Sequence, residues 1–327
     1  MSKLVTIYGG SGFVGRYIAR RLAKDGWRVR VAVRRPNEAM HVKPYGTPGQ
    51  VEPVLCNIRD DESVALVMQG SDAVVNCVGL LCEAGKNTFD DVQVDGAERI
   101  ARIAAEQGVS NLVHLSAIGA DADSNSDYAR TKAEGEARIV AAFPDAVILR
   151  PSVIFGSEDG FFNRLASMSR LGPIFPTIGG GTTFQPVYVD DVAQAAVLGV
   201  TGEAPAGVYE LGGPDQATQR ELVQEMLKVV RRRKLILNLP FWLARIDAWA
   251  FELVQKLSFG LIKAPVTRDQ VKLLAVDNVV SEDAKGFADL GIKPAAMAAI
   301  LPDYLWRFRP SGQYDAIKES AKNLRLN

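Results

Sequence analysis

The sequence predicts an α/β protein built on a doubly wound parallel sheet, with a smaller C-terminal α/β lobe. Three observations lead to this prediction. Short apolar runs alternate with helical patterns through the first half of the 327 residues, a glycine-rich loop joins the first run to the first helical pattern, and the alternation loosens after Phe155. Strand–helix alternation at this spacing is typical of a parallel sheet with helices on both faces.

Six apolar runs are expected to form the strands of the sheet, and four periodic segments the helices between them. The strands are Leu4–Tyr8, Val29–Val33, Val51–Leu55, Ala73–Cys77, Leu112–Ser116 and Ala146–Leu149. The helices are Phe13–Lys24, Asp61–Met68, Val92–Glu106 and Thr131–Ala142.

In the second half of the sequence we expect a strand near Phe184–Val189, a helix near Val192–Val200 and a strand at Val208–Leu211. A further helix is expected from about Gln219 into the basic run Arg231–Lys234. We therefore expect a main domain over residues 1–155 and a smaller lobe over 156–310, interleaved with the core sheet near 184–200. A polar tail over 311–327 is expected to be loosely held.

Composition excludes several classes of protein. Lys plus Arg and Asp plus Glu both number 38, so no global field favours nucleic acid. Cys56, Cys77 and Cys82 lack CxxC spacing, and with two histidines a metal site or a histidine-based hydrolase is not expected. His114 lies in an apolar run and is expected to be a satisfied core residue. We expect no targeting segment and no membrane span, and place the chain in a bacterial cytoplasm.

The loop after the first strand has the pattern of a dinucleotide site. Glycines at 9, 12 and 15, with Phe13 and Val14 between the last two, give GxxGxxG between a strand and a helix. One glycine permits the turn, one lets backbone N–H groups approach a pyrophosphate, and one allows close packing of helix on strand. The alternative is a simple tight turn. The position within a strand–helix–strand unit favours a Rossmann-type site.

Arg34 and Arg35 end the second strand, where an acidic residue would bind the ribose 2′-hydroxyl of NAD. Arginine instead accommodates a 2′-phosphate, so the pair predicts NADPH as the cofactor. The alternative is that both arginines only solvate the end of the strand.

Tyr128 and Lys132 stand four residues apart, on one face of a helix, and Ser116 ends a strand at the edge where ligands bind in this architecture. A nearby ammonium is expected to lower the pKa of the tyrosine toward the range of a general acid. The alternative is an ordinary helix face.

Together with Arg150–Gly156, Pro186–Ala193 and Tyr209–Pro214, these residues resemble the extended or atypical branch of the short-chain dehydrogenase/reductase superfamily over about the first 225 residues. The resemblance implies roles by position. Asn57 and Ile58 would flank the adenine, although many relatives have an acidic residue at Asn57. Cofactor contacts are implied for Cys77, Val78, Gly79, Pro151 and Val153, and Tyr128 and Lys132 would also hold the nicotinamide ribose.

The segment Leu239–Lys263 is expected to form an amphipathic helix, with one stripe made by Trp242, Ile246, Trp249, Leu253 and Leu257. It either caps the smaller lobe or forms a surface for a partner or a membrane interface. In the second case the basic run 231–234 would meet lipid head groups.

A narrower resemblance extends to about residue 305. Ala142–Ala146, Phe155–Asp159, Gly172–Ile174, Gln185–Val189, Pro265–Val271 and Asp289–Ile292 follow the order found in the nucleotide-binding accessory subunits of respiratory complex I (NADH:ubiquinone oxidoreductase). The resemblance implies a bacterial form: a peripheral protein with tightly bound NADPH on the cytoplasmic side of the inner membrane. It would stabilise the assembly through contacts with other subunits, without turnover.

Two other functions remain open on the sequence. The complete Ser116, Tyr128 and Lys132 triad favours a stand-alone NADPH-dependent reductase or epimerase. Atypical relatives also include factors of coenzyme-Q biosynthesis, which the apolar C-terminal surface suits as well.

Overall fold

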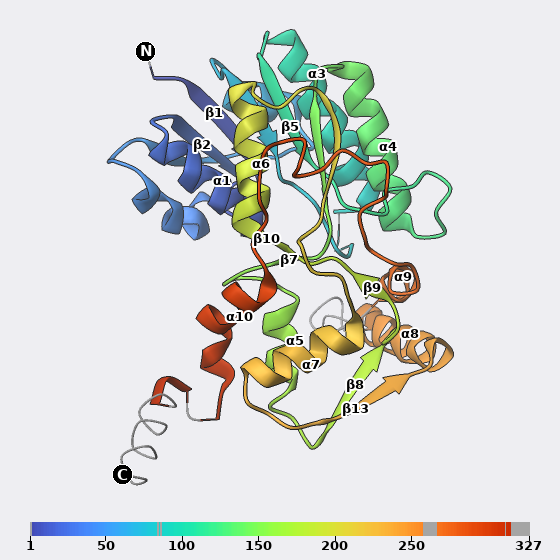
Figure 1. Ribbon diagram of the computed structural model, residues 1–327. Coiled ribbons are helices and arrows are strands. Elements are labelled where there is room, and N and C mark those ends of the chain that lie inside the picture. Colours follow the sequence, from blue (N-terminus) through green and yellow to red (C-terminus); the bar gives the residue numbers. More distant parts are fainter. Residues whose placement is uncertain (1, 84, 86, 258–266, 311, 315–327) are drawn as a thin grey trace, which may run out of the picture.

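The computed structural model describes residues 2–83, 85, 87–257, 267–310 and 312–314 (Figure 1). Its centre is a seven-stranded sheet in which all strand pairs are parallel. The strands are β1 (Leu4–Tyr8), β2 (Arg28–Val33), β3 (Val51–Leu55), β4 (Ala73–Asn76), β5 (Asn111–Leu115), β6 (Val147–Pro151) and β11 (Gly207–Leu211). The predicted Rossmann-type sheet is confirmed.

The order across the sheet is β11-β6-β5-β4-β1-β2-β3. The chain runs outward from β1 in one direction and then returns to build outward from β4 in the other. Ligands of open α/β sheets bind where this order reverses, beyond the carboxyl ends of the strands. The reversal lies between β1 and β4, where Tyr8 pairs with Asn76.

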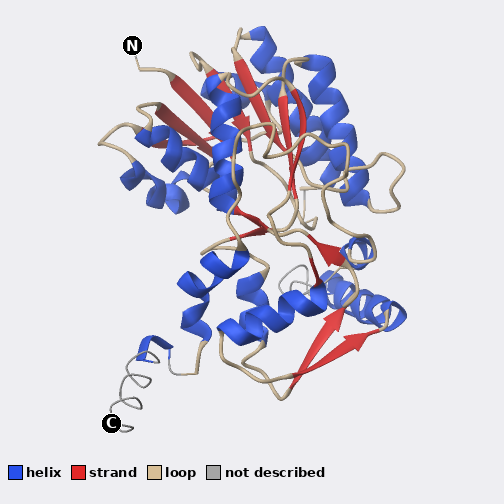
Figure 2. Ribbon diagram, viewed as in Figure 1, coloured by secondary structure: helices blue, strands red, loops and turns tan. Residues whose placement is uncertain are grey.

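Helices cover both faces of the sheet (Figure 2). One face carries α1 (Phe13–Lys24), α6 (Val189–Thr201) and the 3-10 helix η1 (Pro36–Tyr45). The other carries α2 (Asp61–Met68), α3 (Asp95–Glu106) and α4 (Asp127–Ala142), with the π-helix η2 (Asp90–Val94) leading into α3. Ile18 and Leu22 show why α1 forms on its face: they stand four residues apart, and both are fully buried.

A smaller lobe lies beyond the carboxyl edge of the sheet, in the lower part of Figure 1. Its core joins α5, α7, α10 and β8, with Phe162, Phe175 and Leu301 fully or almost fully buried. The helices are α5 (Phe162–Met168), α7 (Gln219–Val229), α8 (Phe241–Leu257), α9 (Arg268–Leu273) and α10 (Met297–Leu305), followed by the 3-10 turns η3 (Trp306–Phe308) and η4 (Gly312–Tyr314). Short strand pairs complete it: β7 (Ile154–Phe155) with β10 (Val187–Tyr188), β9 (Thr183–Phe184) with β12 (Ala217–Thr218), and β8 (Ile174–Ile178) with β13 (Leu235–Leu239).

Several expected boundaries are wrong in detail. Helix α4 begins at Asp127 rather than Thr131, because Ser126 caps it through a side-chain bond to the Ala129 N–H. The single strand expected at Phe184–Val189 is two short strands, since Pro186 interrupts it and the two halves pair with different partners. Strand β13 and helix η1 were not expected.

Helix α8 covers much of the expected amphipathic helix, and residues 258–266 lie outside the described part. Trp242 and Trp249 are 62% and 54% exposed, and Ile246 is also exposed. These three side chains of the stripe therefore face solvent and do not cap the lobe. Leu253 and Leu257 have side chains outside the description, as do residue 311 and the tail over 315–327. In the described chain, no helix has the length and apolarity to cross a membrane.

Candidate dinucleotide site

The glycine loop between β1 and α1 is packed too tightly for side chains. Gly9 has a φ of +75°, and a Cβ on Gly15 would lie 2.6 Å from both the Gly10 Cα and the Gly9 carbonyl oxygen. Helix α1 starts at Phe13 with Gly12 as its N-cap, no acidic residue in its first turn and no side-chain cap among described residues. Its first N–H groups and its dipole therefore favour a negatively charged group at this end. This cradle fits the pyrophosphate of a dinucleotide.

The loop after β4 lies beside the glycine loop. A Cβ on Gly9 would come within 3.2 Å of the Cys77 carbonyl and 3.3 Å of the Val78 side chain. The Val78 N–H donates to Asn76 Oδ1 at 3.0 Å, which fixes the turn. Burial raises the pKa of the Cys77 thiol to about 12, so this cysteine is an uncharged wall of the site.

Arg34 and Arg35 both follow β2 and are exposed. Arg35 forms an ion pair with Glu38, with 3.0 Å between Nη1 and Oε1. No hydrogen bond or ion pair of the Arg34 side chain to another described residue is present, and this guanidinium is the freer of the two to meet an anion.

Asn57 and Ile58 follow β3 and have structural contacts of their own. Asn57 Oδ1 accepts the Arg59 N–H at 3.2 Å, and the Asn57 N–H donates to Ser63 Oγ at 2.9 Å. The Ile58 side chain packs on α3, where a Cβ on Gly96 would lie 3.0 Å from Ile58 Cδ1. Both residues hold the turn before α2 at the outer end of the same sheet edge.

Lys132 reaches from α4 to the centre of that edge. Its Nζ donates to the Leu115 carbonyl at 3.0 Å and lies 3.5 Å from the Cβ position of Gly79. The side chain is 4% exposed, and burial lowers its pKa to about 8, opposed by the nearby Glu136 carboxylate. At neutral pH the ammonium is therefore present, between the end of β5 and the loop that follows β4.

Tyr128 does not behave as expected. Burial raises its pKa to about 12, and the Lys132 ammonium is not among the causes of the shift. The predicted lowering of the pKa is wrong because partial burial of the hydroxyl disfavours the charged phenolate. The ring itself packs edge-on against Phe89, with centroids 6.0 Å apart. No hydrogen bond joins the Tyr128 hydroxyl to another described residue.

Ser116 belongs to a network of hydrogen bonds and ion pairs that was not predicted from the sequence. Its hydroxyl donates to the Glu136 carboxylate, which also accepts from Arg150 at 2.6 Å between Oε2 and Nη2. Arg150 extends the network to Glu210 at 3.6 Å. A signal for Glu136 existed, since residues 128, 132 and 136 repeat every four positions along one helix face.

Pro151 and Val153 lie in the crossing between lobes. Their carbonyls accept the N–H groups of Ile118 and Val187, both at 3.0 Å. Between them, Ser152 Oγ lies 2.7 Å from Asn278 Oδ1, so the C-terminal part of the chain reaches back to this edge.

His114 is buried as expected, but only half satisfied. Its Nδ1 lies 3.1 Å from Asn76 Nδ2, whereas Nε2 has no partner among the described residues. Burial, with a contribution from the Lys132 charge, lowers its pKa well below 6.5 and keeps the ring neutral.

Comparison with known proteins fits this geometry. The family model described as the NAD dependent epimerase/dehydratase family matches residues 5–212. The chain belongs to this family. A UDP-glucose 4-epimerase from Thermus thermophilus, solved with NAD, has the same fold at a TM-score of 0.67 and 17% identity, covering 94% of this chain and 99% of that one.

Within this family, relatives in complex I match almost the whole chain. The protein named NADH dehydrogenase [ubiquinone] 1 alpha subcomplex subunit 9, mitochondrial, of Arabidopsis thaliana is 35% identical over 94% of this chain and 79% of its own. The NADH-ubiquinone oxidoreductase 40 kDa subunit of Neurospora crassa is 31% identical over 98% and 83%. The expected resemblance to complex I subunits, within the extended short-chain dehydrogenase/reductase superfamily, is confirmed. A ceramide reductase of Caulobacter vibrioides is 30% identical over 80% and 83%.

Proposed function

We propose that this protein is an NADPH-binding accessory subunit of respiratory complex I that stabilises the assembly without turnover of its own. The observation that carries the proposal is the similarity to complex I subunits, at 31–35% identity over almost the whole chain. It spans 94–98% of the chain, beyond the residue 212 at which the family model ends.

The cofactor would be held by residues of both loops and of α4. The glycines at 9, 12 and 15 would leave room for the pyrophosphate at the N-terminus of α1, Arg34 would meet the 2′-phosphate, and Lys132 would donate to the nicotinamide ribose. When bound, the nicotinamide supplies hydride-transfer chemistry. We propose the remaining adenine-side and nicotinamide-side contacts at Asn57, Ile58, Cys77–Gly79, Pro151 and Val153.

Two features of the triad oppose turnover. The Ser116 hydroxyl donates to Glu136, so its proton is already committed to a carboxylate that Arg150 holds in place. Tyr128 has a pKa of about 12, far from the working range of an acid at neutral pH. Binding needs neither group to transfer a proton.

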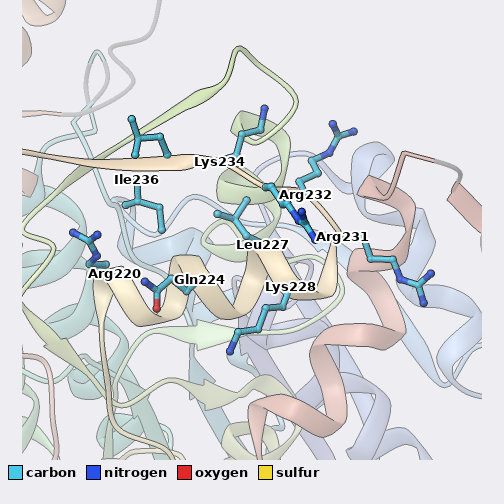
Figure 3. Close-up of a pocket in the computed structure, with 10 residues that line it drawn as sticks. Arg220, Gln224, Leu227, Lys228, Arg231, Arg232, Lys234 and Ile236 are labelled. Carbon is cyan, nitrogen blue, oxygen red and sulfur yellow. The ribbon is translucent and has the colours of Figure 1, made fainter.

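We propose the exposed surface of the smaller lobe as the face toward the complex and the membrane. Leu235 and Leu237 on β13 join Trp242, Ile246 and Trp249 on α8 as exposed apolar side chains. Leu235 also lines a groove of about 730 Å³ between α7 and β13 (Figure 3). Its six cationic side chains are Arg220, Lys228, Arg231, Arg232, Arg233 and Lys234.

A cationic groove and exposed aromatic residues on the same lobe suit the anionic head groups and the interface of a lipid surface. We place the protein on the cytoplasmic side of a bacterial inner membrane, as a peripheral component.

The test is isolation of the tagged protein from detergent-solubilised native membranes, with identification of the accompanying polypeptides and of the bound nucleotide. Complex I polypeptides together with stoichiometric NADP(H) are expected. Recovery of the protein alone, without complex I polypeptides, under the same affinity tag and detergent conditions overturns the proposal.

A stand-alone NADPH-dependent reductase is the second candidate, favoured by the similarity to a ceramide reductase and by the presence of all three triad residues. Tyr128→Phe separates the two, because it removes a hydroxyl that makes no hydrogen bond within the described chain and so leaves packing intact. Loss of an NADPH-dependent reduction supports the reductase. Unchanged respiration with the cofactor still bound supports the subunit.

A further inference from the structure

The N-terminus of α4 is capped by a side chain from the C-terminal part of the chain. Asp269, on α9, accepts the Ser126 hydroxyl at 2.8 Å, the Asp127 N–H at 3.0 Å and the Tyr128 N–H at 3.2 Å. One carboxylate therefore satisfies two backbone N–H groups of the helix and complements its dipole. Sequence spacing gives no hint of this contact, since the partners lie about 140 residues apart.

The contact is part of a longer strap, which we define as residues 267–278. Lys272 Nζ donates to the Asn125 carbonyl at 2.8 Å, and Gln270 Nε2 donates to the Leu81 carbonyl at 3.2 Å. Asn278 Nδ2 donates to the Ile118 carbonyl at 3.2 Å. The strap thus follows the carboxyl edge of the sheet past the loops after β4 and β5 and the start of α4 (Figure 1).

The other side of α9 packs on the surface-bearing helix. Val271 is 1% exposed and forms a small core with Ala244 and Ala248 of α8, to which Phe241 and Ile178 also contribute. These alanines lie on the inner face of α8, whereas Trp242 and Trp249 lie on its exposed face. A displacement of α9 would therefore move α8 as well, because packed side chains transmit strain.

We propose that Asp269 is a positioning residue that couples occupancy of the dinucleotide site to the placement of α8 and its exposed aromatic face. This inference rests on the proposed function. Tyr128 and Lys132 occupy the first two turns of α4, so the helix end that Asp269 holds is the one that would contact the ribose of a bound cofactor. A cofactor that fixes this end favours the docked position of α9, and docked α9 favours cofactor binding.

Because NADPH binding and the docking of α9 are linked equilibria, each must favour the other by the same factor. The coupling can therefore be tested by measuring either one. In the full-length protein, saturating NADPH is expected to slow amide hydrogen exchange in α9 (268–273) and α8 (241–257) by about fivefold or more, the lower end of typical coupling factors. Asp269→Asn keeps the shape but removes the charge and one acceptor. It is expected to abolish this protection and to weaken NADPH binding by a similar factor.

Asp277→Asn is the matched control. It makes the same change within the strap, at a carboxylate whose one hydrogen bond to a described residue is from the Thr183 N–H at 2.7 Å and which has none to α4. It is expected to leave the Kd for NADPH and the NADPH-dependent protection as in the wild type. A purely structural role for Asp269 would lower the Tm of Asp269→Asn equally with and without NADPH.

The outcomes are distinct. Wild-type binding of NADPH with no change of exchange in α8 and α9, or an Asp269→Asn protein with wild-type Kd and protection, overturns the coupling alone. A wild-type protein that binds neither NADPH nor NADH overturns the cofactor part of the proposed function, and the coupling with it.

Discussion

Arg34 and Arg35 are neighbours with different surroundings, which makes each a control for the other. Arg34→Ala is expected to raise the Kd for NADPH by about tenfold or more while leaving that for NADH unchanged, since hydrogen bonds to charged groups contribute about 1.5–3 kcal/mol. Arg35→Ala breaks an exposed pair with Glu38 and is expected to change either Kd little. Titration of both dinucleotides with both variants decides this. Equal losses for NADPH and NADH would contradict a 2′-phosphate contact.

Lys132 predicts a pH dependence of cofactor binding. Its pKa of about 8 in the free protein means that the ammonium loses its proton as pH rises through 8. Because the ammonium is the form that donates to the ribose and attracts a polyanion, NADPH affinity is expected to be constant below about pH 7.5 and to fall above pH 8. Lys132→Met should bind more weakly and without this dependence. A wild-type Kd that stays flat from pH 7 to 9 would count against the assignment.

Individual residues were predictable where type and position both constrain them. The glycine loop, Lys132 and the paired arginines follow from motif spacing, and the structure places them at one edge of the sheet. The pKa of Tyr128 was predicted in the wrong direction, since helical spacing to Lys132 says nothing about how far the fold buries the hydroxyl. Asp269 was unpredictable, because a cap from a distant element has no local pattern.

At the scale of elements, the packing of α4 on the π-helix η2 depends on one glycine. A Cβ on Gly135 would lie 2.1 Å from the Gln93 carbonyl oxygen, which is backbone and cannot turn aside. Gly135→Ala is therefore expected to lower the free energy of unfolding by about 1–3 kcal/mol, although alanine usually stabilises a helix interior relative to glycine. Denaturant titration measures the loss.

Gly181→Ala is the control for that substitution. Nothing lies within 4 Å of its Cβ position and its backbone is not left-handed, so the change is expected to stay within about 0.5 kcal/mol. If both variants changed the free energy of unfolding by a similar amount, the backbone of α4 and η2 would have moved apart to make room for the added methyl group.

The regular elements of the large sheet were predictable because buried parallel strands are continuous apolar runs. Those of the smaller lobe were less so. Strand β13 has only exposed and half-buried residues and pairs, within the described chain, with β8 alone. Its sequence merges with the apolar start of α8. The π-helix at Asp90–Val94 continues the pattern of α3 and differs only in backbone hydrogen bonding.

For the molecule as a whole, substitutions on the exposed surface of α8 are expected to affect assembly without affecting stability. Trp242→Ser combined with Trp249→Ser is expected to leave the free energy of unfolding within about 1 kcal/mol, because both rings are already largely in water. Retention of the protein with membrane-bound complex I is expected to fall strongly. Leu66→Ser, on α2 of the large lobe, is a control at a 72% exposed apolar residue. Full retention of the double variant in membrane fractions would refute the assigned face.

We propose a division of the chain at residue 155, with the later segment returning to the main sheet. Helix α6 covers one face of that sheet, and β11 supplies its edge strand beside β6. The two lobes are therefore interleaved along the sequence, and neither is one continuous stretch of chain.

This interleaving has a consequence during synthesis. β6 leaves the ribosome about sixty residues ahead of β11, the strand that pairs with it, and at ordinary rates of translation that gap lasts several seconds. Until then the nascent chain exposes Val147, Ile148 and Leu149 on an unpaired edge, the kind of surface on which chains associate wrongly. Pauses in translation between residues 156 and 206 should therefore lower the soluble yield of the protein while leaving the finished molecule unchanged.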